Sequence, residues 1–194
     1  MSLVFQVKNN DLEKLIRTKI DELWYQETVL GSSVLIVGDG GNGKTTALNI
    51  IKNSLLDEDR VKVSCIFDLK NPDYWNFSYL LTEIYLYFSS ESSVDNIIGI
   101  SDYHKVERIL NIFSKSRSIN VILFDTAEES LGTTEANLIE GLINKLPNCL
   151  CVIASRPCGS NIVKKMGGLE KISTYNMSGF NREESLSFIE QRGP

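Results

Sequence analysis

A glycine-rich segment between two apolar runs constrains the fold of this 194-residue chain more than any other feature. Residues 34–37 are aliphatic and mostly β-branched, which is typical of a buried strand. Residues 38–45 then match the pattern G-x-x-x-x-G-K-[ST] at every fixed position, and apolar side chains recur at helical spacing over residues 47–56. A strand, a glycine loop and a helix in this order predict a phosphate-binding loop.

The residue types of this loop suit a bound phosphate. Glycines let the backbone turn its N–H groups inward, and a helix that begins near Gly43 adds the positive end of its dipole. Lys44 is expected to reach the β- and γ-phosphates of a nucleotide, and the Thr45 hydroxyl is expected to hold Mg²⁺. Asp39 would repel a phosphate, so we expect it to point outward. The predicted nucleotide contacts in the loop are Gly38, Asp39, Gly40, Gly41, Asn42, Gly43, Lys44, Thr45 and Thr46.

Composition narrows the classes of protein. Hydrophobic residues make up 42% of the chain and charged residues 23%, as in a soluble globular protein of one domain, with or without a fragment of a second. A net charge of −5 argues against broad nucleic-acid binding. The four cysteines form no C-x-x-C pair and there is one histidine, so we interpret the cysteines as buried thiols rather than zinc ligands. No signal peptide or membrane-spanning stretch is visible, which predicts a cytoplasmic protein without a membrane partner.

Strand and helix patterns alternate along the chain. Strands are predicted over residues 61–69, 119–125, 149–154 and 169–177, with 172–177 as the best part of the last one. Helices are predicted over residues 11–24, 74–88, 102–116, 135–146 and from 179 onward. The helix at 74–88 is rich in aromatic residues, but no lysine or arginine lies between Lys70 and Lys105, so packing is favoured over nucleic-acid stacking. Together with the strand at 34–37, the pattern predicts an α/β fold. It has a five-stranded parallel sheet flanked by helices on both faces, with the ligand at the carboxyl ends of the strands.

Two further strands end in residues that suit this ligand. The apolar run at 119–125 ends in Asp125, whose carboxylate is expected to hold Mg²⁺. Glu128, or alternatively Glu129, is placed to orient or deprotonate an attacking water. The strand at 149–154 is followed by Ser155 and Arg156, and Arg156 is either a γ-phosphate sensor or a surface charge. Because these groups all follow strand ends, we expect them to form one site.

Three motifs resemble those of the STAND signalling NTPases, and within them the NACHT group. Residues 121–129 resemble the Walker B strand with its acidic pair, residues 151–157 resemble a sensor strand ending in Ser-Arg-Pro, and residues 175–180 resemble the junction into a helical domain. Thr126 differs from the family, which favours glycine there. The resemblance covers about residues 31–190 and implies a three-layer P-loop NTPase fold, with the sensor strand between the Walker A and Walker B strands.

The resemblance also implies a function. It implies a slow, Mg²⁺-dependent ATPase that acts as an ATP/ADP switch, oligomerises with ATP and belongs to a larger signalling protein. On this hypothesis residues 1–30 form an N-terminal helix and linker, residues 31–178 the P-loop NTPase core, and residues 179–194 the start of a truncated helical domain. Two alternatives remain open: a motor or loader ATPase of the AAA+ or RecA type, and a scaffold that binds nucleotide without hydrolysing it.

Overall fold

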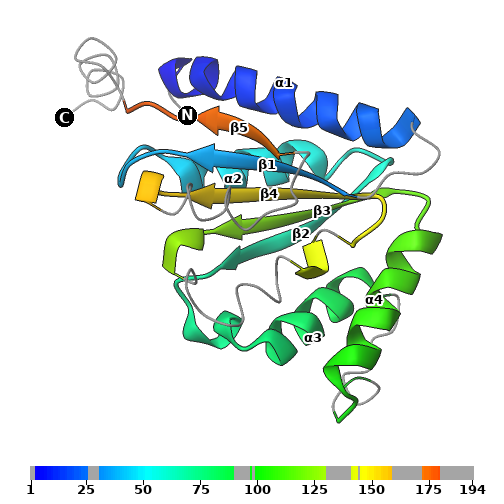
Figure 1. Cartoon of the computed structure of the whole chain (residues 1–194). Coiled ribbons are helices and arrows are strands. Elements are labelled where there is room, and N and C mark those ends of the chain that lie inside the picture. The colour runs from blue at the N-terminus through cyan, green and yellow to red at the C-terminus, as the bar shows by residue number, and fades with distance from the viewer. Residues whose placement is uncertain are drawn as a thin grey trace.

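Five parallel strands form one sheet, and all of them point the same way (Figure 1). The computed structural model describes residues 3–25, 31–89, 97, 99–129, 141–143, 145–158 and 172–179. The sheet order is β2-β3-β4-β1-β5, which places β4 between β1 and β3, as expected for a sensor strand. The strands are β1 (Ser32–Val37), β2 (Val61–Asp68), β3 (Ile119–Asp125), β4 (Cys149–Ser155) and β5 (Ile172–Asn176).

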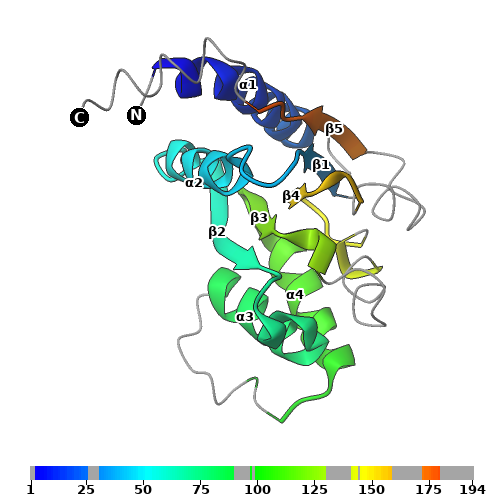
Figure 2. The same cartoon turned by 90° about the vertical axis from the view of Figure 1, so that its left-hand side faces the viewer.

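Helices cover both faces of this sheet, and each face has its own apolar cluster. The helices α1 (Leu3–Tyr25) and α2 (Lys44–Leu55) lie on one face, and α3 (Phe77–Phe88) and α4 (Asp102–Lys115) lie on the other (Figure 2). Side chains of β1 alternate between the two: Val34 and Ile36 pack with α1 and α2, whereas Leu35 and Val37 pack with α3 and α4. Period-two alternation in a strand that is buried on both faces explains the continuous apolar runs, and the predicted three-layer α/β fold is confirmed.

Some predicted boundaries are wrong for local reasons. The aromatic segment is split into a 3₁₀ turn, η1 (Pro72–Trp75), and α3, because two asparagines act as caps. Asn71 accepts a hydrogen bond from the backbone of Asp73 and Asn76 accepts one from Tyr79, each at 3.1 Å. The first helix begins well before residue 11. Of the predicted helix at 135–146, only residues 141–143 and 145–146 are described, and 141–143 are helical; the predicted helix after residue 179 lies outside the described residues.

A bulge in β2 sets the register at the carboxyl end of the sheet. The pairing of β2 with β3 shifts between Val63 and Ile66. Ser64 is fully buried there, and its hydroxyl oxygen accepts a hydrogen bond from the backbone N–H of Leu123 at 3.1 Å. The hydroxyl thus replaces a backbone acceptor that the bulge removes from the ladder. Beyond the shift, Asp68 lies directly beside Asp125 on the neighbouring strand.

The cysteines differ in exposure. Cys149 and Cys151 are buried with their sulfur atoms 3.8 Å apart, and Cys65 is half-buried. Cys158 is exposed, so the interpretation of all four as buried thiols is wrong for this one. Among the described helices, none combines the length and apolar character needed to cross a bilayer.

Candidate functional site

The loop between β1 and α2 has the backbone that the glycine pattern predicts. Gly41 and Gly43 adopt φ angles of 83° and 85°, in the left-handed region that favours glycine. Gly43 is the N-cap of α2, so the first N–H groups of that helix point into the loop. Gly38 is held by a different constraint: a Cβ there would lie 2.7 Å from the carbonyl oxygen of Met177. Asp39 is exposed, as expected.

Lys44 lies at the centre of the loop. Its side chain is nearly buried, at 9% exposure, and its ammonium donates to the carbonyl oxygens of Gly38 at 2.6 Å and Asp39 at 2.9 Å. These bonds wrap the loop around the cation. A phosphate bound in the loop would therefore meet a positive charge that is already positioned and partly desolvated.

Thr45 and Asp125 are brought together from two elements. The Thr45 hydroxyl donates to Oδ2 of Asp125 at 2.5 Å, and the backbone N–H of Thr126 donates to Oδ1 at 2.8 Å. Asp125 is only 4% exposed, so its oxygens are fixed by these two donors. A hydroxyl and a carboxylate oxygen are the hard ligands that Mg²⁺ prefers, so this pair fits the predicted ion. The lysine and the aspartate thus lie at the same end of the sheet.

Glu128 and Arg156 form an ion pair beside the loop. Glu128 lies in a short turn, η3 (Ala127–Glu129), and accepts the backbone N–H of Arg156 at 3.0 Å. The Nε of Arg156 lies 3.2 Å from the other carboxylate oxygen, with side-chain exposures of 9% for Glu128 and 55% for Arg156. The guanidinium also borders the loop, since a Cβ on Gly40 would lie 3.8 Å from its nearest atom. Arg156 therefore lies between the loop and the glutamate.

Three other predicted residues are placed less directly. The Ser155 hydroxyl is buried and donates to the carbonyl of Arg156 at 3.1 Å, while the Ser155 carbonyl accepts from the N–H of Gly38 at 3.2 Å. Ser155 thus ties β4 to the loop through its backbone. Glu129 and Thr46 are exposed, and no described contact draws them toward the loop.

Two features of this end of the sheet were not predicted. Asp68 ends β2 beside Asp125, and the sequence signal was available, because Ile-Phe-Asp at 66–68 parallels Leu-Phe-Asp at 123–125. Asn42 was predicted as a nucleotide contact, but its bond to the chain after β5 was not. Its side-chain amide donates to the carbonyl oxygen of Met177 at 2.9 Å, a contact that spans 135 residues.

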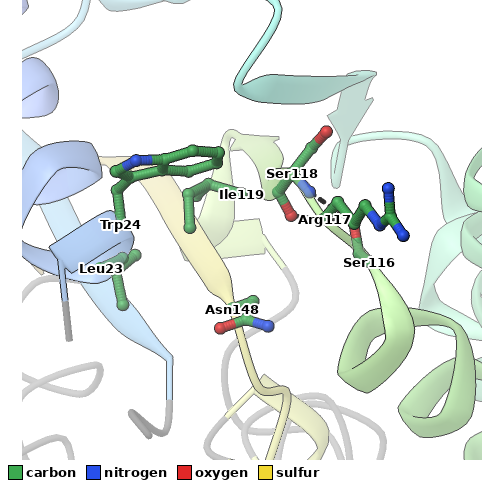
Figure 3. Close-up of a pocket in the computed structure, with 7 residues that line it drawn as sticks. All are labelled: Leu23, Trp24, Ser116, Arg117, Ser118, Ile119 and Asn148. Carbon is green, nitrogen blue, oxygen red and sulfur yellow. Dashed lines mark hydrogen bonds between the residues drawn. The ribbon is translucent and has the colours of Figure 1, made fainter. Parts of the chain in front are cut away.

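A separate hollow of ≈ 200 Å³ lies at the amino-terminal ends of the strands, between the end of α1 and the turn before β3 (Figure 3). The indole of Trp24 borders it, and the guanidinium carbon of Arg60 lies 5.6 Å from that ring. None of the predicted nucleotide-site residues lines it. The lining residues are Leu23, Trp24, Ser116, Arg117, Ser118, Ile119 and Asn148.

Comparison with known proteins identifies the fold. No protein-family model matches this sequence, and no curated protein is detectably similar to it. The structure is similar to Drosophila ORC bound to DNA, with a TM-score of 0.70 at 18% identity over 96% of this chain and 49% of that one. It is also similar to Cdc6p from Pyrobaculum aerophilum, with a TM-score of 0.67 at 12% identity over 94% of this chain and 48% of that one. For the Aeropyrum pernix ORC2 protein in ADPNP and ADP complexes, the TM-score is 0.66 at 14% identity, over 94% of this chain and 51% of that one.

These similarities show a shared three-layer α/β fold, in which a five-stranded parallel sheet lies between helices. The chain spans about half the length of each of these neighbours. At this low sequence identity the neighbours say nothing about the role of single residues. They also give no specific support to a STAND or NACHT assignment.

Proposed function

We propose that this domain binds ATP or ADP with Mg²⁺ and hydrolyses ATP slowly, as an AAA+-type ATPase module of a larger protein. The observation that carries the proposal is the hydrogen bond between Thr45, in the first turn of α2, and Asp125, at the end of β3. It joins the two oxygen ligands of a Mg-nucleotide site across two separate elements. The neighbouring ADPNP and ADP complexes of Aeropyrum pernix ORC2 support the same ligand class.

We assign each residue of the site a role within this proposal. Lys44 neutralises charge on the β- and γ-phosphates, and the N–H groups of the loop and of α2 bind their oxygens. Thr45 and Asp125 hold Mg²⁺, which when bound withdraws charge from the phosphate oxygens. Glu128 orients the attacking water and accepts its proton, and Arg156 senses the terminal phosphate.

The pairing of Glu128 supports slow turnover. One of its carboxylate oxygens accepts a hydrogen bond from the backbone N–H of Arg156, and the other forms an ion pair with the Arg156 side chain. To accept a proton from water, at least one oxygen must exchange its partner, which lowers the population of the competent state. Glu129 is exposed and remains the alternative base.

Nucleotide binding is tested by Lys44→Ala, with Lys115→Ala on α4 as a matched control. Loss of the central cation should weaken binding of a fluorescent ATP analogue by about two orders of magnitude or more, as for a charge-assisted contact in a desolvated site. Lys115 is exposed and distant, so its variant should bind normally. Equal affinities of the two variants would reject the site.

Hydrolysis is tested separately by Glu128→Gln and Glu129→Gln. We expect Glu128→Gln to retain ATP binding and to lose about 10²–10⁴-fold in turnover, the usual contribution of a general base. If only Glu129→Gln loses turnover, the other carboxylate is the base. ATP that persists unchanged on the wild-type protein would favour the non-hydrolysing scaffold.

A second candidate function is a DNA-dependent loader ATPase. Drosophila ORC and the Aeropyrum pernix ORC1 protein are similar in fold and are bound to DNA in their structures. The prediction against broad nucleic-acid binding therefore has no support from the fold, and it rests on the net charge of −5 and on the absence of lysine and arginine between Lys70 and Lys105. Stimulation of ATP turnover by duplex DNA, lost as salt is raised, would favour the loader. The STAND-type switch now rests on the sequence motifs alone, and it predicts ATP-dependent oligomers without DNA.

A further inference from the structure

The phosphate loop is bonded to the chain that leaves β5. The side-chain amide of Asn42 donates to the Met177 carbonyl at 2.9 Å, and the Met177 N–H donates to the Val37 carbonyl at 2.6 Å. Met177 is thus held by the last residue of β1 on one side and by the loop on the other. It lies directly after β5, and its side chain is buried.

Two glycines make this contact possible. A Cβ on Gly38 would lie 2.7 Å from the Met177 carbonyl oxygen, and a Cβ on Gly179 would lie 3.1 Å from Oδ1 of Asn42. Asn42 is therefore enclosed between the loop and residues 177–179. We expect a displacement of the loop at Asn42 to be passed to this segment through the hydrogen bond to Met177, because the closely packed backbone leaves little free space around it.

We propose that Asn42 couples the phosphate loop to residues 177–179, so that nucleotide binding and the conformation of this exit segment are linked. The inference rests on the proposed nucleotide binding. Two residues of the loop transmit the change. Asn42 bonds Met177 directly. Gly38 packs against Met177 and accepts the ammonium of Lys44, which a phosphate would draw toward itself.

The coupling is reciprocal by thermodynamic necessity. If nucleotide stabilises the exit segment, a change in the exit segment must alter nucleotide affinity by the same factor. Residues outside the G-x-x-x-x-G-K-[ST] pattern then affect binding, which a loop that acts independently would not show.

The first experiment is hydrogen exchange on the full chain, with and without saturating Mg-ATP. Amides in the peptide 172–179 should exchange about fivefold more slowly with nucleotide, the change that corresponds to one strengthened hydrogen bond. In Asn42→Ala at saturating Mg-ATP, this slowing should fall below about twofold, since the bond to Met177 is gone. Asn53→Ala, which changes an exposed asparagine of α2, serves as the control variant. The peptide 116–121, at the amino-terminal end of β3, serves as the control region.

The second experiment tests reciprocity with two glycines. Gly179→Ala should lower the affinity for a fluorescent ATP analogue by about three- to tenfold, within the usual range of coupling between sites. Gly141→Ala is the matched control, because a Cβ there meets nothing within 4 Å, and it should bind normally.

The outcomes separate the coupling from nucleotide binding itself. Slower exchange in wild type that Asn42→Ala abolishes, with weaker binding by Gly179→Ala, supports the coupling. Normal binding with unchanged exchange at 172–179, or normal binding by Gly179→Ala, overturns the coupling and leaves the ATPase proposal standing. Absence of Mg-ATP binding to wild type overturns both.

Discussion

The ion pair between Glu128 and Arg156 can be measured by a double-mutant cycle of Arg156→Ala and Glu128→Gln. The structure separates two parts of the interaction: a side-chain contact of 3.2 Å and a bond of 3.0 Å from the backbone N–H of Arg156. Arg156→Ala removes only the first part, because alanine keeps the N–H. Glu128→Gln removes the negative charge from both.

The magnitudes follow from exposure. Arg156 is 55% exposed, so water screens its side chain and we expect Arg156→Ala to lower the free energy of unfolding by about 0.5–1 kcal/mol. Glu128 is 9% exposed, and loss of its charge-assisted bonds should cost about 1–3 kcal/mol. The coupling energy should equal the side-chain part, about 0.5–1 kcal/mol.

Urea unfolding of the wild type, the two single variants and the double variant gives the coupling directly. A coupling within about 0.3 kcal/mol of zero would mean that the side-chain contact contributes nothing. A coupling above about 3 kcal/mol would mean that water does not screen the pair. Either result would refute the reasoning from exposure.

Three further predictions concern stability. Ser64→Ala should lower the free energy of urea unfolding by about 1–3 kcal/mol, because the buried N–H of Leu123 loses its acceptor. Ser33→Ala is its control and should cost nothing, since the buried Ser33 hydroxyl has no partner among the described residues. Burial raises the pKa of the Cys149 thiol well above its ordinary value. The contribution of the thiol to stability is therefore complete below the unfolded-state pKa. It falls as pH rises toward the folded-state pKa, by up to about 1.4 kcal/mol per pH unit. The melting temperature of Cys149→Ala should then fall less steeply than that of wild type as pH is raised into the alkaline range. Thr126 has a φ of 54°, in the left-handed region that favours glycine. Thr126→Gly should raise the melting temperature, because relief of about 1–2 kcal/mol of backbone strain exceeds the entropy cost of glycine. A lower melting temperature would contradict this prediction.

Local features of the chain were readable in advance. Gly41 and Gly43 occupy positive φ angles because the pattern places glycine where a loop must turn sharply. Apolar strands that alternate with helices predicted a parallel sheet, and strand-end Asp125 predicted that its site lies at the carboxyl ends of the strands. The break of the aromatic segment at Asn76 also has a local signal that the sequence prediction missed. An asparagine directly before a helical stretch favours the N-cap position, and Asn76 accepts the N–H of Tyr79 there.

The amino-acid sequence by itself determined the elements, the faces they bury and the edge where the ligand would lie, because these depend on residue type and spacing along short stretches. Only the tertiary structure decided which residues meet at that edge. Asn42 bonds a carbonyl 135 residues away, and Asp68 reaches Asp125 only through the bulge at Ser64. Both contacts depend on which strands are neighbours and in which register, and hydrophobic periodicity is the same for every order of buried parallel strands.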